Sequence, residues 1–105
     1  MVKKNLQVIW DKEAKEELKK IYQYIKEKSE PSAKKVRSAI IETSPKLSEA
    51  PEIYEQDKFA EKALGNIRSF VRWHYRITYQ VLKTHIIVLA VTHTSQDPKK
   101  LRVIR

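Results

Sequence analysis

Three consecutive strand-like runs constrain the fold of this chain more than any other feature of its sequence. They extend from Ile67 to Trp73, from Tyr75 to Leu82 and from Ile86 to Val91, and β-branched and aromatic residues occur throughout them. The breaks between the runs, at Trp73-His74 and Lys83-Thr84, are short. Short breaks between runs of this composition are typical of hairpins, so the pattern predicts three consecutive antiparallel strands.

Alternation along the first two of these strands separates the arginines from most of the apolar residues. The face expected to carry the arginines comprises Arg68, Phe70, Arg72, Arg76, Thr78 and Gln80. The opposite face comprises Ile67, Ser69, Val71, Trp73, Tyr75, Ile77, Tyr79 and Val81. Because an apolar sheet face must be covered in a stable domain, we expect helices to pack on the second face.

A short apolar-rich run from Leu6 to Trp10 predicts a first strand, and an amphipathic helix follows it. Asp11 is placed to cap this helix, whose apolar residues recur at the three-and-four spacing of one helix face. They are Ala14, Leu18, Ile21, Tyr22 and Ile25. Acidic residues precede basic ones along the segment, as the helix dipole favours, and we expect the helix to end near Lys28.

A second amphipathic helix and a connection complete the predicted architecture. Pro31 stands where this helix can begin, and Pro45 removes a helix hydrogen bond, so the helix should end near Thr43 or kink there. No sustained period follows between residues 48 and 63. The elements predict an α+β fold with one domain over residues 1–105, in which a two-helix hairpin packs on a small antiparallel sheet in the order βααβββ.

Positive charge is concentrated in the C-terminal part of the chain. The formal net charge is +9 over 105 residues, and from Ala63 onward eight Lys or Arg residues stand against one acid, Asp97. Five of the six arginines also lie there. Since the planar arginine side chain binds phosphate or carboxylate with two parallel hydrogen bonds, the distribution predicts acidic partners for the C-terminal half.

The composition also excludes several classes of function. The chain has no cysteine, and its single glycine, Gly65, excludes a glycine-rich phosphate loop. His74, His85 and His93 lack the spacing of metal ligands, so we expect neither a metal nor a cofactor. No apolar run approaches the ~20 residues of a membrane span, and the N-terminal residues lack the pattern of a secretory signal. We therefore expect a cytoplasmic protein without a membrane partner.

The arginines of the predicted sheet, together with one histidine, are the strongest candidates for chemistry. Arg68, Arg72 and Arg76, with His93 after the third of these strands, could bind a phosphate on one sheet face. Cleavage of RNA by its own 2′-hydroxyl needs a base, a cationic clamp and an acid, which a histidine beside arginines can supply. The alternative is that these arginines keep the sheet face soluble or hold the carboxylates of a partner.

The C-terminal half resembles that of the RelE/ParE superfamily of toxins, which includes plasmid stabilisation proteins. The resemblance rests on the runs Arg68–Val81, Ile86–His93 and Gln96–Pro98, with a Tyr-Arg-Ile-x-Tyr motif, a short turn, an aliphatic strand and a histidine-containing tail. The preceding segment with Leu47 and Pro51 is similar to the helical hairpin of that superfamily. The resemblance implies the same fold, a bacterial toxin activity, a cognate antitoxin, and operator DNA bound through the toxin-antitoxin complex.

Two activities occur in this superfamily, and the site residues favour one of them. RelE-like members cut messenger RNA on the ribosome, and here Arg68 and Arg72 match their basic strand positions while Arg76 matches their Tyr-Arg residue. Phe70 fills a further basic position, a later arginine position falls near Gln96, and no tyrosine follows the Tyr-Arg strand. If the chain is an enzyme, the resemblance therefore implies a ribosome-dependent mRNA interferase with an incomplete catalytic set.

ParE-like members bind DNA gyrase and lack that catalytic set, and the tail from Val91 to Pro98 is nearer to theirs. We therefore expect a ParE-like toxin that poisons gyrase, with the ribosome-dependent nuclease as the alternative. A degenerate module that only binds antitoxin and DNA is the third interpretation. We expect the antitoxin to dock as an extended or helical segment over the helices and sheet edge, with acids opposite the arginine face.

Overall fold

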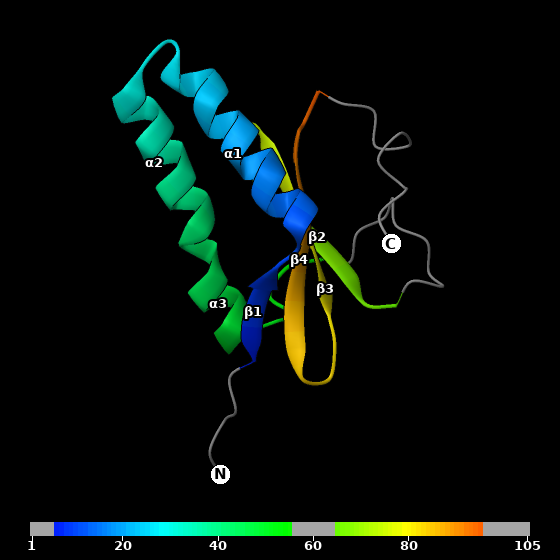
Figure 1. Ribbon diagram of the computed structural model, residues 1–105. Coiled ribbons are helices and arrows are strands. Elements are labelled where there is room, and N and C mark those ends of the chain that lie inside the picture. Colours follow the sequence, from blue (N-terminus) through cyan, green and yellow to red (C-terminus); the bar gives the residue numbers. More distant parts are fainter. Residues whose placement is uncertain (1–5, 56–64, 96–105) are drawn as a thin grey trace.

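The computed structural model describes residues 6–55 and 65–95, which form three helices and four strands. These are β1 (Gln7–Trp10), α1 (Lys12–Lys26), α2 (Glu30–Ile41), α3 (Thr43–Glu49), β2 (Ile67–Arg72), β3 (Tyr75–Val81) and β4 (His85–His93). The helices lie on one side of the sheet, and the two long ones form a hairpin (Figure 1). In the described part of the chain, no helix combines the length and the apolar character that crossing a membrane requires.

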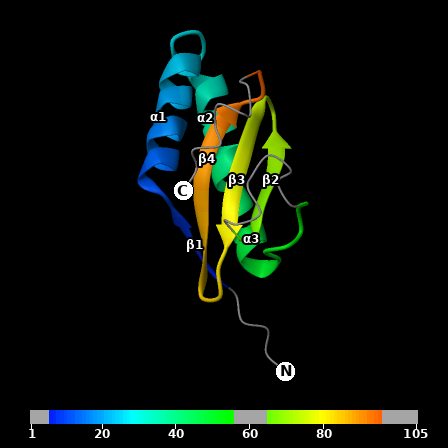
Figure 2. The ribbon, with the colours of Figure 1, turned by 90° about the vertical axis from the view of Figure 1, so that its right-hand side faces the viewer.

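The four strands form one sheet in the order β1-β4-β3-β2 (Figure 2). The two hairpins β2–β3 and β3–β4 are antiparallel, as predicted, but β1 pairs parallel with β4, so that Gln7 lies opposite His85 and Trp10 opposite Val88. The α+β class and the order of helices and strands are confirmed. The sheet is therefore mixed rather than antiparallel. The prediction missed the parallel pair because β1 pairs with β4 through long-range packing, which alternation within β1 does not reveal.

The predicted helix starts are confirmed by their capping contacts. The Asp11 side chain accepts a hydrogen bond from the Glu13 backbone N–H at 3.1 Å, which satisfies one of the free donors at the start of α1. Ser29 caps α2 in the same way by accepting from the Ser32 N–H at 3.3 Å, with Pro31 in the first turn. Both long helices therefore begin where local side-chain chemistry favours a start.

A break at Glu42 divides the second helical segment into α2 and α3. Pro45 is the third residue of α3, where a helix residue needs no N–H donor, so the restart at Thr43 accommodates it. The Thr43 hydroxyl donates to the Ile40 carbonyl at 2.6 Å across the break. The predicted end or kink near Thr43 is thus confirmed, and it turns α3 so that its Leu47 is fully buried.

The core lies between the helices and one face of the sheet. Ile40 and Leu47 from the helices and Ile77, Tyr79 and Val88 from the strands have no exposed surface. Each such side chain contributes roughly 1.5–3 kcal/mol through its removal from water, so this layer fixes how the helical hairpin sits on the sheet. The positions of the candidate site residues follow from that arrangement.

Candidate functional site

The pairing of β2 with β3 divides the predicted arginine face between the two sides of the sheet. Arg72 pairs with Tyr75, and Arg68 pairs with Tyr79, so both arginines lie on the helix-facing side with the tyrosines. Arg76 pairs with Val71 and lies on the opposite face. The predicted common row is therefore wrong. A two-residue turn at residues 73–74 places Arg72 on the face of Tyr75, whereas alternation within each strand says nothing about how the two strands combine.

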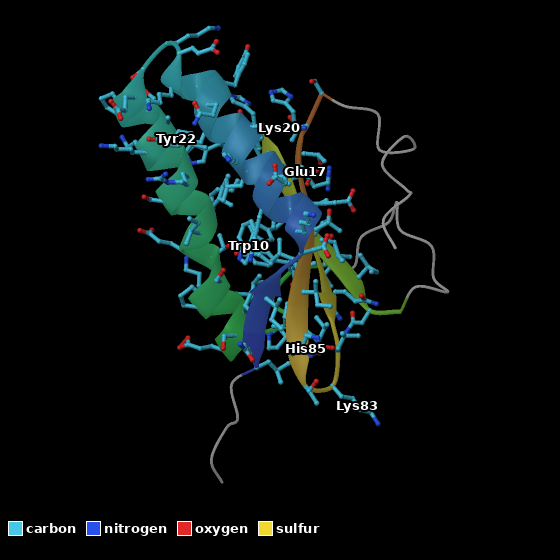
Figure 3. All side chains as sticks on the ribbon, viewed as in Figure 1. Trp10, Glu17, Lys20, Tyr22, Lys83 and His85 are labelled. Atoms are coloured by element: carbon cyan, nitrogen blue, oxygen red, sulfur yellow. The ribbon has the colours of Figure 1, made fainter. Side chains whose placement is uncertain are left out.

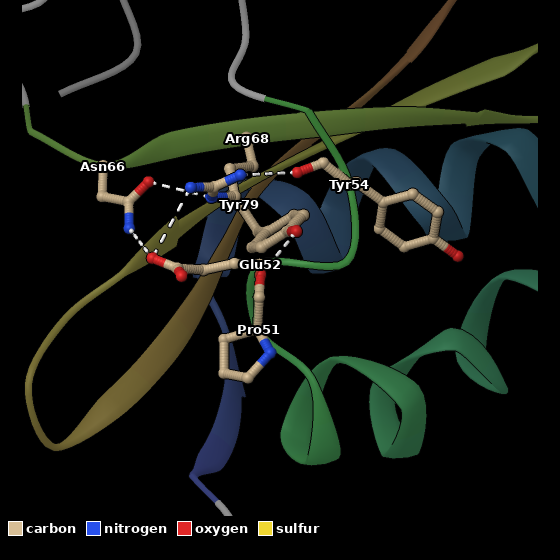
Figure 4. Close-up of polar contacts among 6 residues, drawn as sticks. All are labelled: Pro51, Glu52, Tyr54, Asn66, Arg68 and Tyr79. Carbon is tan, nitrogen blue, oxygen red and sulfur yellow. Dashed lines mark hydrogen bonds and ion pairs between the residues drawn. The ribbon is translucent and has the colours of Figure 1, made fainter.

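Arg68 holds the segment after α3 against β2 (Figure 4). Its Nη1 donates to the Tyr54 carbonyl at 2.7 Å, its Nε donates to the Asn66 side-chain oxygen at 3.0 Å, and its Nη2 lies 3.5 Å from a Glu52 carboxylate oxygen. Only 15% of the side chain is exposed. The guanidinium is thus engaged on three sides by the chain itself, which is the environment of a structural residue.

Aromatic packing and a tyrosine hydroxyl complete this contact, which we call the Arg68 clamp (Glu52, Tyr54, Asn66, Arg68 and Tyr79). The ring of Tyr54 stacks on Phe70 with 4.2 Å between centroids. The Tyr79 hydroxyl donates to the Pro51 carbonyl at 2.8 Å, and burial raises the pKa of Tyr79 to about 12 (Figure 4). The Ser69 N–H also donates to the Glu55 carbonyl at 3.2 Å, so the outer edge of β2 is partly covered.

Arg76 and His93, two further candidates, lie apart from the clamp. Arg76 donates from Nη1 to the Ser69 hydroxyl at 3.4 Å and pairs with Thr92 of β4. His93 is exposed at the end of β4, pairs with Tyr75, and has its Nδ1 2.7 Å from the Ser95 hydroxyl. Its ring meets Tyr75 edge-on at 5.4 Å and lies 6.1 Å from the ring of His74.

The four predicted site residues therefore occupy three separate environments. Arg72 and His93 share the helix-facing side of the sheet, but Tyr75 separates them, so their strands are two spacings or about 10 Å apart. Arg68 belongs to the clamp and Arg76 to the opposite face. Among residues 6–55 and 65–95, no group of three or more His, Cys, Asp or Glu side chains could hold a metal ion.

A groove lies beside the edge strand β1, and the sequence did not indicate it. It has a volume of about 740 Å³. This surface, the β1 groove, is lined by Gln7, Val8, Ile9, Trp10, Lys15, Leu18, Lys19, Tyr22, Gln23, Arg37 and Ile41. Figure 3 shows Trp10 and Tyr22 from different elements on the inner side of the helical hairpin. The groove thus combines apolar walls with three cations.

Its walls contain exposed apolar side chains and a backbone edge. Ile9 is 41% exposed and Ile41 is 46% exposed, while the Arg37 guanidinium lies 4.3 Å from the centre of the Tyr22 ring. Because β1 is the last strand of the sheet, the backbone groups on its outer side have no strand partner in the described structure. An amphipathic segment with acidic residues would match this surface in both polarity and charge.

Helix α1 seals the sheet where β1 ends. β1 pairs with β4 only as far as Val88, and beyond it the Glu17 carboxylate accepts a hydrogen bond from the Val91 N–H at 2.8 Å. Glu17 lies on the side of α1 that faces β4 (Figure 3). Burial raises the pKa of Glu17, although the hydrogen bond from Val91 and the charge of Lys20 lower it. Sequence periodicity alone could not assign this contact.

Comparison with known structures finds the same fold in chains from toxin-antitoxin systems. A chain from the chromosomal ParDE system of P. aeruginosa matches with a TM-score of 0.69 and 19% identity, over 86% of this chain and 97% of that one. The toxin-antitoxin complex RelBE2 from Mycobacterium tuberculosis matches with a TM-score of 0.60 and 22% identity, over 85% of this chain and 98% of that one. A mutant of E. coli toxin RelE in the free state matches with a TM-score of 0.63 and 18% identity, over 93% of each chain.

These structures share the fold of this chain. Its family is identified by a comparison of the sequence with family models. The model of the ParE toxin of the type II toxin-antitoxin system, parDE, matches residues 8–98. The chain therefore belongs to the ParE toxin family. A comparison with curated proteins gives no match. The resemblance to RelE/ParE toxins expected from residues 68–98 is confirmed.

Proposed function

We propose that this ParE-family toxin acts by binding and poisoning DNA gyrase rather than by cutting RNA. The observation that supports a binding mode is the separation of the four residues that a nuclease would need together. Arg68 is engaged in the clamp, and Arg76 lies on the sheet face opposite Arg72 and His93. Strand-scission chemistry needs a base, a cationic clamp and an acid within reach of one phosphate.

Gyrase supercoiling and cleavage-complex assays with the purified chain test this proposal. We expect inhibition of supercoiling and accumulation of cleaved DNA, with no new cuts by primer extension on messenger RNA in a ribosome-containing translation reaction. Arg76→Ala should weaken poisoning without abolishing it, because a binding surface loses one contact. In-frame RNA cuts that disappear in Arg76→Ala would instead establish the nuclease alternative. Folded protein that is inactive in both assays would leave the degenerate module.

The same proposal includes a cognate antitoxin that occupies the β1 groove. The expectation of acids facing a single arginine face changes, since that face is divided between the two sides of the sheet. The groove offers Lys15, Lys19 and Arg37 around apolar walls instead. An antitoxin segment with an apolar face and acidic flanks would bury Ile9 and Ile41 and place its carboxylates near these cations.

Two charge reversals on α2 test the antitoxin site. Arg37→Glu should abolish co-purification of the antitoxin encoded with the chain, whereas Lys35→Glu makes the same charge change on an exposed residue outside the groove. Both variants should have similar melting temperatures, so loss of binding would not reflect unfolding. Equal retention of the antitoxin by both variants would place it elsewhere. In this proposal the complex, rather than the toxin alone, binds operator DNA, and all these partners lie in the bacterial cytoplasm.

A further inference from the structure

The β1 groove contains three cations that the described chain leaves without an anionic partner. Lys15 and Lys19 come from α1 and Arg37 comes from α2, and no acid lines the groove with them. Within residues 6–55 and 65–95, none of the three side chains forms an ion pair or a side-chain hydrogen bond. An anionic segment that enters the groove therefore finds all three cations available.

Arg37 differs from the two lysines because an aromatic ring holds its side chain in place. Its guanidinium carbon lies 4.3 Å from the centre of the Tyr22 ring, and this contact bridges α2 and α1 (Figure 3). The Nζ atom of Lys26 lies 6.0 Å from the same ring, at the outer limit of such contacts. A guanidinium over a ring uses none of its N–H donors for the contact. Arg37 is therefore preorganised to bind a carboxylate.

Lys15 and Lys19 are placed to attract an anion rather than to fix its orientation. Both are exposed, and among the described residues neither lies over an aromatic ring. They stand one helical turn apart on the same side of α1, so their charges add up over the groove. An exposed lysine loses side-chain freedom when it binds, and its ion pairs contribute little to affinity. Exposed cations of this kind mainly raise the rate of association.

We propose that Arg37, positioned by Tyr22, is the specificity-determining residue of the β1 groove, and that the two lysines steer the partner toward it. The inference rests on the proposed function, because the partner is the acidic antitoxin segment. A carboxylate of that segment accepts parallel hydrogen bonds from the Arg37 fork. A side-chain amide at the same place has one acceptor oxygen and satisfies only one arm of the fork, so the contact selects an acid.

The walls of the groove favour a protein segment over a nucleic acid. Aliphatic side chains lie beside the cations, and Ile9 and Ile41 are 41% and 46% exposed. These side chains gain stability from contact with apolar side chains of a partner. A single-stranded nucleic acid instead binds through phosphates along a track of cations and through bases stacked on free aromatic faces. Arg37 already lies over a face of Tyr22, so that face is not free for a base.

Nuclear magnetic resonance of the free, isotope-labelled full chain tests the positioning role without any partner. The ring current of Tyr22 should move the Arg37 side-chain resonances upfield. Tyr22→Phe keeps the ring and should keep this shift, whereas Tyr22→Leu should lose it. Tyr24→Leu is the matched control, because Tyr24 also lies under a cation, Lys28, but outside the groove. Arg37 resonances at random-coil positions in the native chain would overturn the positioning role.

Dissociation rates of the antitoxin encoded with the chain test the specificity of the contact. Arg37→Lys keeps the charge but not the fork, so it should speed dissociation about tenfold. Tyr22→Leu should speed it about fivefold through loss of the cation–π contact, whereas Tyr22→Phe and Tyr24→Leu should leave it unchanged. Because Tyr22 acts through Arg37, the effect of Tyr22→Leu should be much smaller in an Arg37→Lys background. A merely structural role of Tyr22 would give the same effect in both backgrounds.

Association rates test the role of the lysines. Lys15→Gln and Lys19→Gln should each slow association about threefold at low salt, with no difference at high salt and no change in dissociation. Equal changes in dissociation for these variants and Arg37→Lys would overturn the division between steering and specificity.

The outcomes separate this inference from the proposed antitoxin site. If Arg37→Glu retains the antitoxin, the proposed site fails and this inference fails with it. If Arg37→Glu releases the antitoxin but Arg37→Lys dissociates at the native rate, positive charge alone explains binding, so this inference is overturned while the site remains. Displacement of the antitoxin from Arg37 by a single-stranded oligonucleotide would overturn it in favour of a nucleic-acid site.

Discussion

The two ends of β2 carry the same residue type on the same sheet face but in opposite states. At the start of the strand, Arg68 is bonded to Tyr54, Asn66 and Glu52 of its own chain. At the end, Arg72 has a buried Nε without a partner among the described residues. The difference shows that arginines on one face of a strand need not form one site, because the contacts of each guanidinium depend on the segment that packs against it.

The largest test of this comparison is to remove each guanidinium while keeping an apolar stem of similar length. Arg68→Met should lower the free energy of unfolding by roughly 2–4 kcal/mol, since Glu52 and the Tyr54 carbonyl lose their partner and the segment after α3 loses its hold. Arg72→Met should change stability by less than about 1 kcal/mol, because it removes an unsatisfied polar group. Urea unfolding of both variants measures the difference. Equal losses would contradict the difference in the roles of the two arginines.

The turn at Trp73-His74 is the point at which the prediction for the site went wrong. The strands, helix caps and Pro45 break are local features, and they follow from periodicity and residue chemistry within a few positions. The turn length was also visible, and combining it with alternation would have placed Arg72 with Tyr75 and Arg76 with Val71. The division of the arginine face was therefore predictable in principle.

Other parts of the site depend on contacts between distant segments. The segment around Tyr54 shows no hydrophobic periodicity, so no local sequence feature indicated that it would bind Arg68. The parallel pairing of β1 with β4 joins residues almost 80 positions apart, and the β1 groove exists only because of that pairing. Contacts of this kind are decided by packing of the whole domain, which a single sequence does not display.

Tyr79 tests whether the clamp end of the sheet depends on one buried hydroxyl. Tyr79→Phe should destabilise the fold by about 1–2 kcal/mol, because the Pro51 carbonyl loses its donor at 2.8 Å. Burial raises the pKa of Tyr79 from 10.0 to about 12, so the folded state keeps a proton that the unfolded state releases. The stability of the native chain should therefore fall between about pH 10 and pH 12. Chemical denaturation across this range should show that the free energy of unfolding falls less steeply in Tyr79→Phe than in the native chain. Identical pH profiles would show that the Tyr79 hydroxyl does not cause the loss of stability.

The smallest expected effect compares the sealed edge of β4 with the open edge of β1. Glu17 accepts the Val91 N–H, and its burial raises its pKa, so the folded state holds the proton more tightly than the unfolded state. Stability should therefore be greatest below the ordinary pKa of 4.5 and fall as the pH rises through the raised value. Glu17→Gln keeps an acceptor oxygen without the charge, so it should remove this pH dependence and change stability at pH 7 by less than about 1 kcal/mol. Hydrogen exchange of the Val91 amide supplies the second measurement. Protection should persist in Glu17→Gln and fall in Glu17→Ala, whereas equal protection in all three chains would mean that packing of α1, rather than the carboxylate, seals this edge.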